Sequence, residues 1–406
     1  MSDPAANAPV AGGPADALQP WLEERFVWFH RHPELSHRET GTTARLAELL
    51  DNAGIEILDT GLDTGLVAIV RGGAVDSDAE PRPTVALRAD IDALPVDEDT
   101  DLPYRSLTPG AMHACGHDFH MTTILGAALL LHGIADRLPG DVKIVFQPAE
   151  EVPQGGASEV VDTGALGDVQ AIFGAHTTSL LPVGSLAIGA GPICAAVDQF
   201  TIDVRGTQTH GAHPDRGVDG ILIAAATVQN LQSVVSRNLS PTHDGVVSVG
   251  RFVADGAWNV IPEQVTMEGT VRSFHAEDRP MMRRRVEQVA EGTAATFGGH
   301  ASVTWSAGPP SVDNDPHWTE LMRRTALEDG FTVVEPIATM GGEDFACYQQ
   351  VIPGAFINVG TGVIEASNHS PRFRVDPAAL APTARYMAHV ARAALAELAG
   401  ASGAGH

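Results

Sequence analysis

The sequence predicts an α/β protein: a mixed, mostly parallel sheet with helices on both faces, interrupted by one α+β insertion. Short apolar segments alternate with helical segments in the first half of the chain and again near its end, a pattern typical of buried parallel strands. Between these parts, residues 199–305 follow the order strand, helix, strand, strand, helix, strand, which is the order of a ferredoxin-like unit. A chain of 406 residues is long enough to bury two such cores.

The elements of the α/β part follow from periodicity and from residues that end helices. Pro33 and Gly54 end the first two helices, which we expect over residues 16–30 and 41–52. Apolar runs bounded by turn residues predict strands over residues 65–70, 84–89, 142–147 and 171–176, with helices over 119–135 and 157–162. After the insertion we expect a helix over 317–329, strands over 332–335 and 355–359, and a final helix over 376–398.

The insertion is predicted as one compact domain. Its strands are expected over residues 199–204, 246–253, 265–273 and 301–305, and its helices over 217–237 and 279–296. We therefore predict a discontinuous α/β domain formed by residues 1–195 and 309–406, and an inserted ferredoxin-like domain formed by residues 196–308.

Composition excludes several classes of partner. The 25 basic and 51 acidic residues give a net charge of −26, which argues against binding to nucleic acid or to anionic membranes. The three cysteines, Cys115, Cys194 and Cys347, form no disulfide framework and are typical of a reducing compartment. We find no signal peptide and no apolar run long enough to span a bilayer, so we expect a cytoplasmic protein.

One heptapeptide, Met-His-Ala-Cys-Gly-His-Asp at residues 112–118, carries the clearest chemistry. Cys115 and His117 are too close in sequence for a closed structural zinc finger, but they suit an open metal site whose other ligands come from distant strand ends. Sites of open α/β sheets lie beyond the carboxyl ends of the strands. Several candidate residues follow predicted strands in this way: Asp90, Asp92, Glu150, Glu151 and His176.

Adjacent carboxylates at residues 150 and 151 suggest a division of roles. They repel each other unless a cation lies beside them. Because neighbouring side chains of a strand point to opposite sides, one can bind metal while the other holds a water as general base. Taken alone, this pair is typical of a solvated loop, His176 of a hydrogen-bonded core histidine, and Cys115 of a buried small hydrophobic residue.

Together the candidates are more informative. His369, which precedes the last helix, adds a further possible ligand. Five residues then offer nitrogen, sulfur or oxygen donors: Cys115, His117, Glu151, His176 and His369. One tetrahedral zinc ion needs only four donors. Such a set suits two metal ions about 3.5–4 Å apart that share a water or hydroxide. Thiolate and imidazole favour Zn, Mn, Co or Ni over Ca or Mg.

Eight ordered stretches carry a family resemblance: residues 28–34, 88–95, 112–118, 147–151, 259–262, 269–274, 342–345 and 369–371. In this order they resemble the M20 metallopeptidase family, specifically its amidohydrolase branch of hippurate hydrolases, N-acyl-amino-acid amidohydrolases and auxin-conjugate hydrolases. Each stretch is modest alone, but the ordered set covers nearly the whole chain.

The resemblance implies a role for each candidate. The five donors would bind two divalent metal ions, with Asp90 supporting the site, and Glu150 would be the general base that later protonates the leaving amine. The insertion would be a lid that often forms a dimer contact, so we expect a homodimer or higher homo-oligomer. His210 would stabilise the oxyanion, often in the partner subunit's site; His213 is its local alternative.

Two further residues are implied to bind substrate. Asn259 and Arg272 would hold the substrate carboxylate, the arginine as a bidentate partner, although a surface salt bridge is the alternative for Arg272. The sequence departs from relatives at Gln208 and Thr209, where glycines are usual, and at Thr177, where a hydrophobic residue usually follows the histidine.

The function implied is metal-dependent hydrolysis of the amide bond of N-acyl amino acids, such as hippurate-like or N-acetyl substrates. One alternative is a dipeptidase or aminopeptidase of the wider family, but peptidase branches place aspartate-centred ligands where this chain has Cys115, Gly116 and His117. Another is a non-catalytic metal-binding or ligand-binding descendant, which the loss of Glu150 or of a ligand would mark. All of these residues are present.

Overall fold

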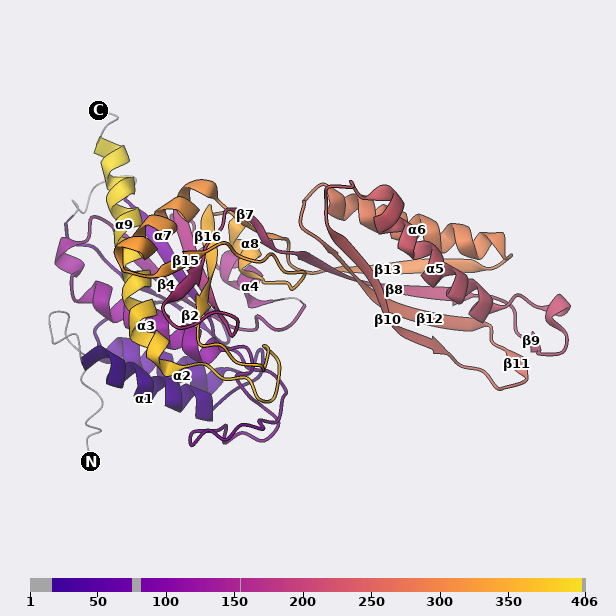
Figure 1. Cartoon of the computed structure of the whole chain (residues 1–406), viewed down its shortest axis with the longest axis horizontal. Coiled ribbons are helices and arrows are strands. Elements are labelled where there is room, and N and C mark those ends of the chain that lie inside the picture. The colour runs from indigo at the N-terminus through magenta and orange to yellow at the C-terminus, as the bar shows by residue number, and fades with distance from the viewer. Residues whose placement is uncertain (1–16, 75–81, 154, 404–406) are drawn as a thin grey trace. The chain divides into compact units, whose positions relative to one another are not determined.

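The computed structural model describes residues 17–74, 82–153 and 155–403 (Figure 1). The chain divides into two compact units. Unit 1 comprises the described residues of Met1–Gly191, Asp313–Ile337 and Asp344–His406, and unit 2 comprises Pro192–Val312 and Ala338–Glu343. Most of the N-terminal segment in which we expected no signal peptide lies outside the described residues.

Unit 1 contains an eight-stranded sheet in the order β1-β2-β4-β3-β5-β16-β6-β15. Four of its strand pairs are parallel (β3 with β4, β3 with β5, β5 with β16, β6 with β15), so the sheet is mixed and mostly parallel. The strands are β1 (Glu56–Leu58), β2 (Leu66–Val70), β3 (Thr84–Asp90), β4 (Asp141–Gln147), β5 (Ala171–Thr178), β6 (Ser185–Ala187), β15 (Thr332–Val334) and β16 (Gly354–Gly360).

Helices cover both faces of this sheet (Figure 1). On one face, α3 (His117–His132) packs against α1 (Leu18–Arg31), α9 (Leu380–Gly403) and β3, and α2 (Thr40–Asn52) and α7 (Pro316–Glu328) join the same apolar core. On the other face, α4 (Gly156–Asp162) and α8 (Phe345–Gln349) contact each other and strands β4 and β5. Every residue of β3 and β4 is buried, which explains why apolar residues predominate on both faces of these strands.

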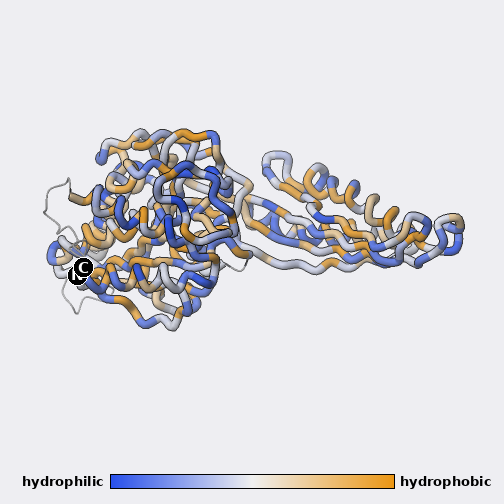
Figure 2. The backbone as a smooth tube through the Cα atoms, turned by 90° about the horizontal axis from the view of Figure 1, so that it is seen from below, coloured by the Kyte–Doolittle hydropathy of each residue, from blue (hydrophilic) through white to orange (hydrophobic). Residues whose placement is uncertain are grey.

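Unit 2 is a four-stranded antiparallel sheet in the order β10-β12-β8-β13, with two helices on one face (Figure 1). Its elements are β8 (Ala196–Arg205), α5 (Gly220–Asn238), β10 (Gly245–Ala254), β12 (Gln264–Ser273), α6 (Asp278–Thr296) and β13 (His300–Ala307). Alternate residues such as Phe200, Ile202 and Val204 face the helices and form the core. Figure 2 shows how hydrophobic and hydrophilic residues are intermixed along the backbone. The predicted α/β fold class with a ferredoxin-like insertion is thus confirmed.

Two helix boundaries differ from the prediction for local reasons. The helix expected from residue 119 begins at His117, because Gly116 adopts a left-handed φ of +85° that turns the chain directly into the helix. The final helix begins at Leu380 rather than 376, because Asp376 first caps a 3₁₀ turn over Pro377–Ala379 and accepts a hydrogen bond from the Ala378 amide.

Short pairs complete the fold: β9 (Thr209–His210) with β11 (Val260–Ile261), and β7 (Gly191–Cys194) with β14 (Val312–Asn314). Among the described residues, none of the helices has both the length and the hydropathy needed to cross a membrane.

Candidate metal centre

All five predicted metal ligands lie in unit 1, around the carboxyl ends of its central strands. Strand β4 ends just before Glu150 and Glu151, and His176 lies near the end of β5. Cys115 and His117 stand at the start of α3, and His369 comes from the loop between β16 and α9. Because β4 and β5 are both parallel to β3, their carboxyl ends meet at one edge of the sheet.

The donor atoms of these residues are in contact distance of one another. Cys115 Sγ lies 3.3 Å from His176 Nε2 and 3.4 Å from His369 Nε2. Glu151 Oε1 lies 3.3 Å from His369 Nε2 and 3.8 Å from His117 Nε2. A carboxylate oxygen of Glu150 lies within 4.8 Å of donor atoms of His117 and Glu151. The predicted ligands and the predicted general base therefore form one cluster.

Unsatisfied buried atoms show that this cluster fits a metal ion. His117 Nε2 and Glu151 Oε1 are both buried, and neither forms a hydrogen bond within the described part of the chain. Buried polar atoms normally have a partner, so such orphaned atoms need an explanation. Both point to the same small space as the thiol and the other imidazoles, and a thiolate, imidazole and carboxylate donor set is suited to a transition metal or zinc.

Neighbouring groups fix which nitrogen of two histidines faces the cluster. The Nδ1 atom of His176 donates to the carbonyl oxygen of Thr177 at 2.7 Å, and His117 Nδ1 lies 3.1 Å from Asp92 Oδ1. Each ring thus keeps Nε2 for a metal ion, which is the usual arrangement of a ligand histidine. Asp92 also accepts hydrogen bonds from Ser36 and from the Glu151 amide. It therefore positions two ligands at once.

The electrostatics of the cluster favour an ionised thiol. Burial opposes ionisation, but His176, His117 and His369 together hold the pKa of Cys115 well below its ordinary value. The short contacts with Cys115 and Glu151 raise the pKa of His369 to about 10. Burial raises the pKa of Glu151 in spite of the nearby His369. A bound cation would counteract that effect of burial by favouring the carboxylate.

Backbone strain is concentrated at the same place. Of the three non-glycine residues with positive φ in the described ranges, two belong to this site: Ala149 at 52° and His369 at 68°. Such conformations persist where the surroundings enforce them, and they are frequent at functional sites. The Ala149 amide donates to Glu39 Oε1 at 2.8 Å, which holds the turn that carries Glu150 and Glu151.

A buried network of polar side chains lies beneath the cluster. The guanidinium of Arg88, 1% exposed, donates to Asp90 Oδ2, Asp344 Oδ1 and Gln147 Oε1 at 2.8, 2.9 and 2.8 Å. Asp344 also accepts from the Gln147 side chain and from the Ala157 amide. The network thus joins β3, the end of β4, the start of α4 and the segment before α8.

This network continues to the ligands through His120. Its Nδ1 donates to Asp90 Oδ1 at 2.6 Å, and its Nε2 accepts from the Thr177 amide at 2.9 Å. Burial lowers the pKa of His120 to about 4, in keeping with a neutral ring that both donates and accepts. From the sequence we assigned a supporting role to Asp90 and named Asp92 as a candidate without a role, but we gave no role to Arg88 or His120. Arg88 could have been noticed as a charged residue within a predicted buried strand. It lies two residues before Asp90, so the two side chains point to the same face of the sheet.

The remaining predicted site residues belong to unit 2. His210, on β9, is exposed and lies opposite Val260 of β11. Asn259 is the residue directly before Val260. Arg272, on β12, is partly buried and donates to Thr270 Oγ1 and the Met340 carbonyl. It pairs with no carboxylate among the described residues, so the alternative of a surface salt bridge is absent there. His213 is exposed in the same loop as His210.

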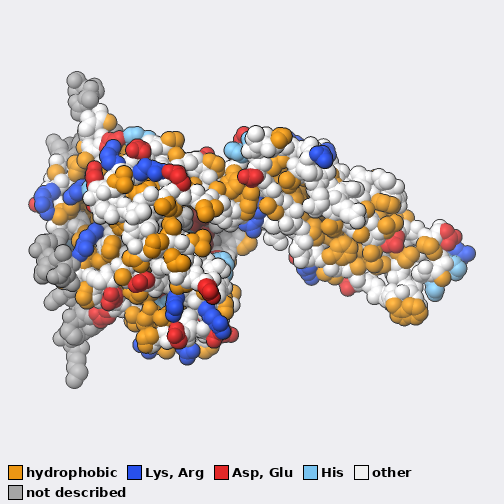
Figure 3. Space-filling view, in the orientation of Figure 1, with side chains coloured by type: hydrophobic (Ala, Val, Ile, Leu, Met, Phe, Trp, Pro, Cys, Tyr) orange, Lys and Arg blue, Asp and Glu red, His pale blue; other side chains and the backbone are white. Residues whose placement is uncertain are grey.

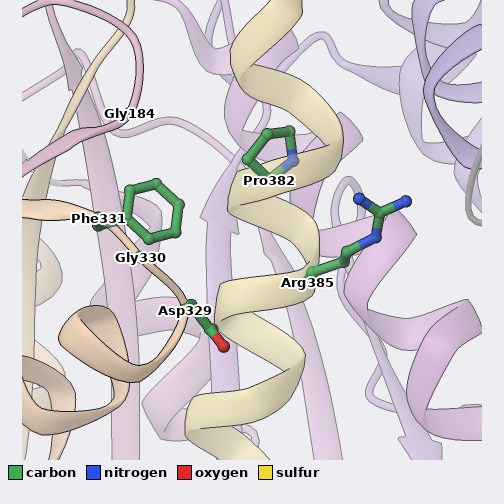
Figure 4. A pocket seen from close by; sticks show the side chains of 6 residues that line it. All are labelled: Gly184, Asp329, Gly330, Phe331, Pro382 and Arg385. Atoms are coloured by element: carbon green, nitrogen blue, oxygen red, sulfur yellow. The ribbon is translucent and has the colours of Figure 1, made fainter.

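A separate pocket of unit 1 contains none of these residues. It is lined by Gly184, Asp329, Gly330, Phe331, Pro382 and Arg385, where α9 passes the turn that follows α7 (Figure 4). Its lining offers neither a nucleophile nor a set of metal ligands, so we place the chemistry at the cluster around Cys115.

Comparison with known proteins shows the family to which the chain belongs. Residues 86–393 match the model of peptidase family M20/M25/M40. The chain is 44% identical over 363 residues to an N-acetylcysteine deacetylase of Bacillus subtilis, covering 89% of this chain and 93% of that protein. It is 37% identical over 382 residues to the IAA-amino acid hydrolase ILR1-like 4 of Arabidopsis thaliana, covering 91% and 84%.

One solved structure resembles this chain over nearly its whole length. The Bacillus subtilis YXEP protein, described as a dinuclear metal binding peptidase from the M20 family, superposes with a TM-score of 0.82 at 40% identity. The match covers 93% of this chain and 98% of that one.

Replacing Arg88 by Met should destabilise the protein severely, because Asp90 and Asp344 would remain buried without their counter-charge. We expect a loss of about 3–5 kcal/mol in the free energy of unfolding, measured by denaturant titration. As a matched control, Arg71→Met removes an exposed pair with Glu56 and should cost about 0–1 kcal/mol. Equal losses in the two variants would contradict the role given to the buried network.

Replacing Cys115 by Ala should lower the metal content of the purified protein, because its thiol is one of the five proposed donors and contacts two of the others, His176 and His369. Metal per chain can be counted by plasma mass spectrometry after dialysis against a defined zinc concentration. Cys194→Ala, in unit 2, is the control and should leave the count unchanged. An unaltered stoichiometry in Cys115→Ala would reject the ligand role.

Proposed function

The chain belongs to peptidase family M20/M25/M40, and from that membership we propose that it hydrolyses the amide bond of N-acyl amino acids such as N-acetyl or hippurate-like substrates. The protein is a metal-dependent amidohydrolase of this family. The observation that carries the proposal is the placement of Glu150 beside a set of five metal donors. The N-acetylcysteine deacetylase that it resembles supports the choice of substrate class.

We assign the metal ions to the donors around Cys115. Two divalent ions of the Zn, Mn, Co or Ni class would be held by Cys115, His117, Glu151, His176 and His369, and they would supply Lewis acidity to the carbonyl and to water. The protein's own contribution is to fix the donor set: Asp92 orients His117, and the Thr177 carbonyl orients His176.

Glu150 carries the proton transfers. Its carboxylate takes a proton from the water whose oxygen attacks the acyl carbon, and then delivers that proton to the departing amine nitrogen as the carbon–nitrogen bond breaks. The adjacent Glu151 is tied to the cluster through His369, so the two carboxylates have separate tasks. The enforced turn at Ala149 keeps Glu150 in place between the two steps.

Unit 2 supplies the groups that recognise the substrate. We assign the substrate carboxylate to Arg272, whose guanidinium has no carboxylate partner among the described residues, and to Asn259. His210, exposed and able to donate a hydrogen bond, is assigned to the oxyanion of the tetrahedral intermediate.

We further propose that the protein is a homodimer formed through unit 2, in which each His210 serves the partner subunit's site. The helix α5 exposes Ile221 and Leu222, and the edge strand β10 exposes Phe252; hydrophobic side chains gather on the visible face of this unit in Figure 3. An unpaired edge strand with apolar side chains favours pairing with a second copy.

The net charge of −26 is unfavourable for binding to nucleic acid and to anionic membranes. The three cysteines suit a protein of the cytoplasm.

Replacing Glu150 by Gln should abolish turnover while metal content persists, because the amide keeps the shape of the side chain but cannot accept the proton. We expect a fall in kcat of at least about 10²–10⁴, followed by release of free amino acid from N-acetyl and hippurate-like substrates. The exposed Glu159→Gln, on α4, is the matched control.

The same assay separates the substrate classes. N-acyl amino acids whose carboxylate is amidated should be poor substrates of the wild-type protein, because Arg272 lacks its partner. Dipeptides keep that carboxylate but have a free amino group in place of the acyl group, so comparing them with N-acyl amino acids tests recognition of the acyl side. Full activity of Glu150→Gln would contradict the assigned base, and faster cleavage of dipeptides would contradict the substrate class.

Mixing two inactive variants tests the shared site. Co-expressed His210→Ala and Glu150→Gln chains should regain about a quarter of the wild-type activity, because half of the random pairs are hybrids with one complete site. Each variant expressed alone is the control and should be nearly inactive. A mixture as inactive as its components would show that His210 acts within its own chain or has no part in the reaction.

A further inference from the structure

A second group of potential metal ligands lies in unit 2, at one end of its sheet. His243 belongs to the loop between α5 and β10, and His275 and Glu277 belong to the loop between β12 and α6. One donor atom from each of these three residues lies within 4.8 Å of the others. None of the three belongs to the cluster around Cys115, whose residues are all in unit 1.

The strand register explains why the two histidines meet. In the antiparallel pair of β10 and β12, Val247 lies opposite Val271, and Gly245 lies opposite Ser273. Continuing the same register by two residues on each strand places His243 opposite His275. Opposite residues of an antiparallel pair have their side chains on the same face, and the ring centroids are 3.8 Å apart.

A buried carboxylate orients the first histidine. His243 Nδ1 lies 2.7 Å from Oδ2 of Asp278, which is 6% exposed at the start of α6. A carboxylate can only accept from the ring, so Nδ1 carries the hydrogen and Nε2 keeps its lone pair. A histidine held by a carboxylate through its other nitrogen is the common arrangement in metal sites. The ring of His275 has no hydrogen-bonding partner among the described residues, and its nitrogens are therefore available.

From this geometry we propose a separate metal site, formed by His243, His275 and Glu277, for a divalent ion of the zinc, nickel, cobalt or copper class. Two imidazoles and one carboxylate match the preferences of these ions. Three protein donors leave the remaining positions to water, as in open zinc sites. Because Glu277 is exposed, the site exchanges its ion with solvent more readily than the buried cluster of unit 1.

The ion would add a further link between two loops that His243 already joins through its contacts with Asp278 and His275. One loop leads from α5 into β10, and the other leads from β12 into α6. Binding would hold the N-terminal end of α6 against the α5–β10 loop. It would thereby stabilise unit 2, since an ion that binds only the folded state shifts the unfolding equilibrium.

Counting ions on the full-length protein tests the site. The protein is dialysed against increasing Zn²⁺, and ions per chain are measured by plasma mass spectrometry. We expect His275→Asn to bind one ion fewer per chain than the wild type, while His300→Asn, an exposed histidine of β13 in the same unit, binds the wild-type number. Asp278→Asn should weaken the additional ion by about 10–100-fold.

Two controls keep the result interpretable. Hydrolytic activity should be unchanged in His275→Asn, because none of the residues assigned to the reaction is altered; this also verifies that the variant folds. In the wild type, Zn²⁺ should protect His243 and His275 from diethyl pyrocarbonate, as read by peptide mass spectrometry, with His300 reacting equally with and without zinc. Equal ion counts in wild type and His275→Asn, or absence of protection, would overturn the proposal and leave the two rings as a stacked pair that binds no metal.

Discussion

The buried charge of Arg88 is the constraint on which the geometry of the metal centre depends. A guanidinium without contact to water must find its partners inside the protein, and here it finds Asp90, Gln147 and Asp344. These partners come from two neighbouring strands and from a segment far along the chain. The ends of β3 and β4 are therefore fixed relative to each other before any ligand is considered. Hydrogen bonds connect these strand ends to the proposed metal ligands. His120 bonds to Asp90, and Asp92, which follows β3, contacts His117.

The division of the chain into two units separates two kinds of requirement. Four of the proposed donors of unit 1 lie near the ends of strands or at the start of α3, and the fifth, His369, lies on the loop between β16 and α9. The residues of unit 2 assigned to the substrate lie on β9, before β11 and on β12, where side chains are exposed or only partly buried. Rigid donors and accessible recognition groups are thus placed on different scaffolds, each with its own core.

The sequence allowed much of this to be predicted, and the failures have physical reasons. Central strands such as β3 and β4 were recognisable because burial on both faces makes most of their residues apolar. The order of elements in unit 2 indicated a ferredoxin-like unit. Donor residues could be proposed from their chemical type at strand ends. The supporting contacts of Arg88 and His120 could not, because they join residues distant in sequence. Neither could the positive φ of Ala149, which arises from tertiary contacts and not from local preference.

The position of His369 along the chain has a consequence for biosynthesis. Every other proposed donor is made early, whereas His369 follows the whole of unit 2 and strand β16. As the ribosome releases the chain from its N-terminus, the Cys115–His176 contact can form long before the last imidazole emerges. The proposed donor set is therefore complete only after residue 369 has been made, and a chain that stops before this residue would lack one of the five proposed donors.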